Sequence, residues 1–177
     1  MNDWLAILKE SVAGEWDNPP PIAALATVDS IGHPHVRHVV CRRIDDDGNI
    51  WITSDARTAK NQHVRDNPNA ELALWLPQKR EQFRIAGTIS INPKREEIWR
   101  EMSDSTRATF FWPAPGQPPN PQQSFATAVS TTVDPPPNFQ VLVLTPEQVE
   151  HLELSPHPHR RRRWQRSSNW ACQQINS

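Results

Sequence analysis

The chain has 177 residues and a formal net charge of −1 at pH 7, with 19 Lys and Arg against 20 Asp and Glu. A near-neutral chain of this length suits one compact domain, and it has no bulk electrostatic attraction to nucleic acid or anionic membrane. No apolar run approaches the ~18 residues of a membrane span, and the N-terminus lacks the regions of a signal peptide. We therefore expect one domain over residues 1–177, located in the cytoplasm.

The cysteine and proline content gives further information on the compartment and on the loops of the protein. The chain holds 2 cysteines, 18 prolines and 8 tryptophans, and it has no tyrosine. Cys41 and Cys172 lie far apart and lack metal-ligand spacing, so we expect free thiols in a reducing compartment. The prolines cluster in 113–137, where flanking aromatic residues favour a long ordered loop over disorder.

The N-terminal segment, residues 1–14, has the pattern of a helix. Asp3 is placed to cap it, and Gly14 is placed to end it. Its apolar face would be formed by Trp4, Leu5, Leu8 and Val12. The prolines at 19–21 would separate this helix from a first strand, Ile22–Val28.

Four further runs of β-branched and bulky apolar residues predict strands. They are Val36–Ile44, Ile50–Thr53, Ala70–Leu76 and Phe83–Ile91. Asp45–Gly48 has the composition of a hairpin turn, in which the glycine supplies a positive φ. A short polar helix with Thr58 as its cap would run to about Asp66, where Asn67 and Pro68 stop it.

The C-terminal half continues with a helix that Pro93 would begin, with Ile98 and Met102 facing inward. A second short helical piece is predicted over Arg107–Phe111. The remaining strands would be Asn138–Thr145, His151–Leu154, and a last hairpin of Arg160–Trp164 with Asn169–Ile175. About seven strands joined mostly by short turns predict a mainly β fold with flanking helices, arranged as a small closed or split barrel.

Two cations in this pattern indicate an anion site. Arg37 lies inside an otherwise apolar strand, and Lys60 lies in the first turn of the following helix. A helix N-terminus already favours an anion, and two side-chain charges would add to that preference. Either cation could instead be an ordinary solvated surface residue. The isolated glycines exclude GxGxxG and Walker loops, so a phosphate would have to be held by side chains and a helix terminus.

The histidines and the basic run are weaker signals. His33 and His35 share one strand face while His38 points the other way, and no carboxylate or cysteine completes a metal set. His63, on the polar helix, is expected to be solvated. Arg160–Arg163 is a weak nucleic-acid signal, because side chains alternate along a strand and only two can reach one site.

Several short motifs, in their order and spacing, resemble those of the pyridoxamine 5'-phosphate oxidase-like flavoproteins. The motifs are RHVVCR at Arg37–Arg42, Thr53 closing the next strand, Arg57–Lys60 before the polar helix, Asn67-Pro68 after it, and Gln82 five residues before Gly87. A Trp-Pro-x-Pro-Gly-x-Pro motif at Trp112–Pro118 is similar to that of one subfamily. The resemblance covers roughly residues 20–175 and implies an FMN-binding split β-barrel that forms a homodimer with FMN at the subunit interface.

The resemblance also implies a set of cofactor-binding residues. They are Arg37, His38, Val39, Val40, Arg42, Ile52, Thr53, Thr58, Lys60 and Gln82. Arg37 and Lys60 would contact the phosphate, strand backbone would match the edge of the flavin ring, and the Gln82 amide would reach the flavin. An arginine from Arg160–Arg163 would also reach cofactor or substrate, with its register left open. Trp51 is expected in the core.

The implied activity is that of an oxidoreductase with non-covalent FMN and an unestablished substrate, since the flavin supplies the redox step. The alternative is a non-catalytic flavin- or haem-binding carrier or sensor that uses the same pocket. No metal, nucleic acid or membrane partner is expected. In the oxidases proper, a lysine and a Tyr, Arg, Ser triplet hold the substrate phosphate. The matching positions here are Arg42, Trp99, Ser103 and Arg107, so we expect a poor pyridoxamine 5'-phosphate oxidase.

Overall fold

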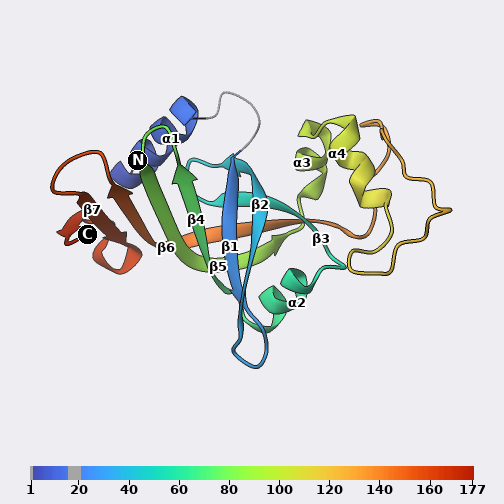
Figure 1. Ribbon diagram of the computed structural model, residues 1–177, viewed down its shortest axis with the longest axis horizontal. Helices are drawn as coiled ribbons and strands as arrows, with labels where there is room; N and C mark the ends of the chain where they lie inside the picture. The colour runs from blue at the N-terminus through green and yellow to red at the C-terminus, as the bar shows by residue number, and fades with distance from the viewer. Residues whose placement is uncertain (1, 16–20) are drawn as a thin grey trace.

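The computed structural model describes residues 2–15 and 21–177, in which antiparallel strands close a barrel (Figure 1). The barrel strands are β1 (Ile22–Val28), β2 (Pro34–Ile44), β3 (Ile50–Asp55), β4 (Asn69–Leu76), β5 (Glu81–Asn92) and β6 (Phe139–Glu153). Their order is β3-β2-β1-β4-β5-β6, and β3 pairs with β6 to complete the ring. Two further strands, β7 (Arg160–Gln165) and β8 (Gln173–Ile175), extend the sheet from β6. The predicted mainly β barrel is confirmed.

The helices cover the barrel at separate places. They are α1 (Asp3–Glu15), α2 (Ala59–Asp66), α3 (Arg95–Glu101) and α4 (Asp104–Ala108), with 3-10 turns at Thr109–Phe111 and Arg166–Ser168. In Figure 1, α2 lies below the barrel, and α3 and α4 lie together beside the loop that follows them. No helix among the described residues is long and apolar enough to cross a membrane.

The helix α1 closes one end of the barrel with its apolar face. Trp4, Leu5 and Leu8 are buried, as their spacing predicted, and they join the interior residues of the strands. Gly48, in the predicted turn after β2, has φ +86, and a Cβ there would lie 2.4 Å from a ring carbon of Trp4. Glycine is therefore needed at this position both for its backbone angle and for space.

A second, smaller core lies between α3, α4 and the outer side of β6. It contains Ile98, Trp99, Met102, Phe110, Phe139, Val141 and Val143. The long loop is attached to this core, because the Trp99 indole donates to Val133 O (2.7 Å) and the buried Arg107 donates to Val129 O (2.8 Å). These contacts hold the proline-rich segment against the α3–α4 unit.

Several predicted boundaries differ from the structure. Asp3 is the first helical residue, and it is the Asn2 carbonyl that accepts the first helical bond, so Asp3 is not the cap. The helix α1 runs one residue past Gly14, and α3 begins at Arg95 instead of Pro93. Met1 and residues 19 and 20 of the predicted proline break lie outside the described residues.

The largest difference concerns β6, which is one strand of 15 residues where two were predicted. Pro146 interrupts the sequence pattern, because proline cannot donate a ladder hydrogen bond. It is tolerated opposite Gly87, where the β5–β6 register shifts at a bulge. A Cβ on Gly87 would lie 2.1 Å from Thr145 O, so the close approach of the two strands depends on that glycine.

The two thiols should react very differently. Burial raises the pKa of Cys41 to about 12, whereas Cys172 is exposed. We expect a thiol-specific aromatic disulfide to modify one cysteine per native chain at mildly alkaline pH, and both after unfolding. A Cys172→Ser variant is the control and should lose the native reaction. Rapid modification of both thiols in the folded protein would contradict the burial of Cys41.

Candidate functional site

The candidate site begins where β2 and β3 part. In these strands Ile44 pairs with Ile50, Arg43 with Trp51, and Cys41 with Ile52. Arg42 is an extra residue in a bulge between the last two pairs. Beyond this point β2 stays paired with β1 and β3 with β6. Within the described residues, the facing edges at 37–40 and 53–55 are therefore not paired with each other. Such edges can offer backbone N–H and C=O groups to a ligand.

Arg37 points from β2 toward the end of the barrel that α2 covers. Its Nη1 donates to Leu25 O (3.1 Å) and to Thr27 Oγ1 (2.7 Å). The contacts among the described residues leave its Nε and Nη2 without a protein partner. A guanidinium anchored through one nitrogen keeps a two-nitrogen edge for an external acceptor.

Lys60 faces the same region from the first turn of α2. Its Nζ donates to Thr58 Oγ1 (2.8 Å). Burial lowers the pKa of Lys60, and the positive charge of Arg37 lowers it further, while Asp55 acts in the opposite direction. The structure thus brings Arg37 and Lys60 near enough to interact electrostatically.

Thr58, predicted to cap α2 with its side chain, makes other hydrogen bonds instead. It occupies the N-cap position of α2, but its side chain does not cap the helix. Its hydroxyl donates to Asp55 O (2.7 Å) and accepts from Lys60 and from Asn61 Nδ2 (3.0 Å). Thr58 therefore ties the end of β3 to the lysine, and the side-chain cap expected from the sequence is wrong.

The charges around this site are not balanced by the protein itself. Arg43 and Arg57, by comparison, pair with carboxylates. Arg37, Arg42 and Lys60 are partly buried, burial lowers the pKa of each, and none has a carboxylate at ion-pair distance in the part of the chain that the structure describes. Because uncompensated buried charge is costly, an anionic ligand fits this site.

The other predicted residues divide between the core and two surfaces. The side chains of Val39 and Ile52 are buried in the barrel, so these side chains could not face a ligand. Arg42 Nε donates to Thr53 Oγ1 (3.4 Å), which joins β2 to β3 at the bulge. The side chain of Val40 is partly exposed on the free edge of β2.

His38 and Gln82 lie apart from the Arg37 side chain. They line a cavity of ≈ 400 Å³ on the outer face of the sheet, together with Ile22 and Trp75. His38 reaches it because alternate residues of β2 point to opposite faces. A single chain thus does not bring all the predicted cofactor residues to one place.

His63 was expected to be solvated, and that expectation is wrong. Its side chain is buried, and its Nδ1 lies 3.0 Å from Thr27 Oγ1. Its ring also lies against the ring of His35, with centroids 4.6 Å apart. The sequence had no signal for this contact, because Thr27 precedes His63 by 36 residues. No group of three or more potential metal ligands is found within residues 2–15 and 21–177.

The arginine run of β7 pairs with carboxylates of β6. Arg161 and Arg163 contact Glu150, and Arg160 and Arg162 contact Glu153. The alternation predicted for this strand is confirmed. Burial alone would raise the pKa of Glu150, but Arg161 and Arg163 hold it below its ordinary value. Trp51, expected in the core, is only partly buried, and its indole donates to Asp45 Oδ2 (3.0 Å).

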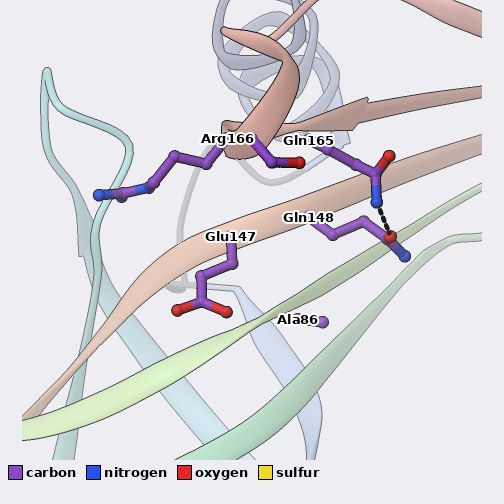
Figure 2. Close-up of a pocket in the computed structure, with 6 residues that line it drawn as sticks. Ala86, Glu147, Gln148, Gln165 and Arg166 are labelled. Atoms are coloured by element: carbon purple, nitrogen blue, oxygen red, sulfur yellow. Dashed lines mark hydrogen bonds between the residues drawn. The ribbon is translucent and has the colours of Figure 1, made fainter.

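A roomier cavity, of ≈ 540 Å³, lies over β5, β6 and β7 (Figure 2). It is lined by Ala86, Glu147, Gln148, Gln165, Arg166 and Ser167. Figure 2 shows the Glu147 and Arg166 side chains extending separately, while Gln165 Nε2 donates to Gln148 Oε1 (3.0 Å). None of the residues predicted for the cofactor lies in this cavity.

Comparisons with known proteins agree with the barrel and its N-terminal motifs. The family model for "Pyridoxamine 5'-phosphate oxidase, FMN-binding domain" matches residues 1–93. The chain is 32% identical over 142 residues to pyridoxine/pyridoxamine 5'-phosphate oxidase 2 of Arabidopsis thaliana, covering 73% of this chain and 72% of that protein. An oxidase of Pseudomonas fluorescens is 29% identical over 92 residues, which span 51% of this chain and 42% of the relative.

A solved structure resembles the whole chain. It is a pyridoxamine 5'-phosphate oxidase-related, FMN binding protein of Nostoc punctiforme, with a TM-score of 0.90 and 30% sequence identity. The match covers 100% of this chain and 99% of that one. The likeness therefore extends through α3, α4 and the proline-rich loop, beyond the segment that the family model covers.

Proposed function

This chain belongs to the pyridoxamine 5'-phosphate oxidase family of FMN-binding domains, and we propose that it binds FMN non-covalently where β2 and β3 part. The flavin would supply the redox chemistry, and the protein would bind and orient it. We propose an oxidoreductase whose substrate differs from that of the oxidases proper. Its two free thiols are in keeping with the cytoplasmic location that we propose for it.

The proposal rests chiefly on the uncompensated pair of Arg37 and Lys60. A phosphate between them would accept from the free nitrogens of Arg37 and would favour the charged form of Lys60, whose pKa burial lowers. The first turn of α2 adds its N–H groups and the positive end of the helix dipole. These are the contacts that a phosphate ester needs in the absence of a glycine-rich loop.

The ring of the flavin would lie along the free edges of the two strands. The backbone groups of Val40 and Thr53 on these edges can supply donors and acceptors to the polar edge of the isoalloxazine. Those of Val39 face β1, since Cys41 N, two residues further on, donates to Pro21 O (2.8 Å). Arg42, fixed by Thr53 at the bulge, adds a positive charge. The Trp-Pro-x-Pro-Gly-x-Pro segment, Trp112–Pro118, lies beside this site, since Trp112 lines a cavity with Thr53 and Lys60.

We further propose a homodimer that closes over the outer face of β1, β2 and β4. Ile22 is 53%, Val36 68% and Trp75 46% exposed on these strands, and apolar groups gathered on one face favour a partner. The cavity lined by His38 and Gln82 lies on this face. The Gln82 contact with the flavin would then be made across the dimer, with FMN at the subunit interface.

The positions that would hold a substrate phosphate in the oxidases are used structurally here. Arg107 is 1% exposed and donates to the carbonyls of Trp99, Met102 and Val129. The Ser103 hydroxyl caps α4 by accepting from Thr106 N (3.3 Å). A buried guanidinium that already donates to backbone carbonyl groups cannot also bind a substrate phosphate. This supports a substrate other than that of the oxidases.

The first prediction concerns the phosphate. The double variant Arg37→Ala with Lys60→Ala should bind FMN on the order of a hundredfold more weakly or worse, because each charge-assisted contact contributes roughly 1.5–3 kcal/mol. Titration calorimetry at fixed salt measures the affinity, and circular dichroism verifies the fold. Arg65→Ala with Arg100→Ala, which removes two exposed helix cations, is the matched control.

The outcome is read against both the parent and that control. Unchanged FMN affinity in the Arg37 and Lys60 variant would remove the basis of the proposal. The spectrum of the purified protein gives an independent reading, since a haem Soret band in place of flavin absorption would favour the carrier or sensor alternative.

The second prediction concerns assembly. Sedimentation at micromolar concentration should find an FMN-loaded dimer. Trp75→Glu should weaken it, because a carboxylate replaces an exposed indole within the proposed interface. Phe125→Glu, on the long loop and also exposed, is the control. A stable FMN-loaded monomer of the parent protein would refute the dimer.

The third prediction concerns the substrate. With pyridoxamine 5'-phosphate and oxygen, the FMN-loaded protein should form pyridoxal phosphate with kcat/KM below about 10⁴ M⁻¹s⁻¹, the lower end of ordinary enzymes. The reason is that Arg107 and Ser103 are engaged within the protein. An authentic oxidase serves as the positive control, and a value above that limit would restore the vitamin B6 assignment.

A further inference from the structure

His63 is connected to the candidate phosphate site through a buried hydroxyl. It lies on α2, about one turn beyond Lys60, and its side chain is buried. Its Nδ1 is 3.0 Å from Thr27 Oγ1, and the same oxygen accepts from Arg37 Nη1 at 2.7 Å. The three side chains form a chain of hydrogen bonds from α2 through β1 to β2.

The direction of these bonds follows from the chemistry of the groups. A guanidinium can only donate, so Thr27 Oγ1 must accept from Arg37. Thr27 is 0% exposed, and its hydroxyl has no acceptor other than His63 among the described residues. A buried hydroxyl proton without an acceptor would be costly. The Thr27 hydroxyl therefore donates to His63 Nδ1, which makes His63 the neutral tautomer with its proton on Nε2.

The surroundings favour this neutral form. Burial lowers the pKa of His63, and the positive charge of His35 and of Arg37 lowers it further. Asp29 and Asp66 act in the opposite direction without reversing the shift. Neutral His63 is thus available as an acceptor, as the hydrogen-bond chain requires.

We propose that His63, acting through the Thr27 hydroxyl, is a positioning residue that orients the Arg37 guanidinium toward an anion held beside Lys60. The inference rests on the proposed binding of the FMN phosphate at this site. With Nη1 fixed by Thr27 Oγ1 and Leu25 O, the Nε and Nη2 nitrogens keep one direction before the ligand arrives. Such preorganisation raises affinity because the ordering cost of a long side chain is met in folding and not in binding.

The decisive comparison is between FMN and riboflavin, which lacks the phosphate. Thr27→Val removes the hydroxyl that accepts from Arg37. His63→Leu removes the ring nitrogen that accepts from this hydroxyl and orients it. Both variants should weaken FMN binding about tenfold, the effect of losing one hydrogen bond to a charged group. Riboflavin affinity should not change. If His63 only packs the interior, its loss should weaken FMN and riboflavin equally, and that result would overturn the proposal.

A conservative variant and a double-variant cycle sharpen the test. His63→Asn keeps an acceptor oxygen near the position of Nδ1 and should restore most of the FMN affinity. In an Arg37→Ala background, His63→Leu should have no further effect, because the residue through which it acts is gone. Additive losses in that cycle would also overturn the proposal. Should His63→Leu fail to fold, the nearly isosteric Thr27→Val makes the same comparison.

Imidazole ¹⁵N chemical shifts of the ligand-free protein give a readout independent of binding. They should report His63 protonated at Nε2 and free at Nδ1, and the opposite tautomer would overturn the proposal. The failures are distinguishable. If Arg37→Ala with Lys60→Ala impairs FMN binding but His63→Leu does not, only the role of His63 is wrong. A parent protein without preference for FMN over riboflavin refutes both proposals.

Discussion

β2 and β3 separate at the Arg42 bulge, and the candidate site exists because of that separation. To close the barrel, β3 pairs with β6 over its whole length from Ile50 to Asp55, while β2 follows β1 as far as Pro34. The two strands cannot remain neighbours under both constraints. The chain then turns into α2, whose first turn lies at the opening. A helix N-terminus, two free strand edges and the Arg37 side chain thereby meet at one place.

Electrostatic balance distinguishes this place from other basic parts of the molecule. Arg160–Arg163 is the most basic run in the sequence, yet its members pair with Glu150 and Glu153. Arg37 and Lys60 are isolated in the sequence, and neither has a carboxylate at ion-pair distance among residues 2–15 and 21–177. Partial burial strengthens their field, since fewer waters screen it. In this chain, the density of cations along the sequence therefore does not indicate which of them lack a carboxylate partner in the fold.

The proline-rich loop and the α3–α4 unit indicate how one barrel accommodates different chemistry. Arg107 and Trp99 hold the loop in place through Val129 and Val133. A residue used in this way is no longer available to a substrate. Changes of this kind leave the barrel and its free strand edges intact while they alter what can bind next to them. They are one reason why family membership alone does not assign a substrate.

Local chemistry in the sequence was enough to predict most strands, the apolar face of α1, the glycine turn at Gly48 and the alternation of the β7 arginines, because each depends on near neighbours or on a period of two or 3.6 residues. It also singled out Arg37 and Lys60. Other features depended on distant residues. β6 continues past Pro146 because of Gly87 in another strand. The orientation of Thr58 depends on the end of β3, and the burial of His63 depends on its contact with Thr27. Which polar groups meet across the barrel is decided only when distant strands pair. Each such contact needs two side chains that are far apart in the sequence, so neither segment alone indicates it.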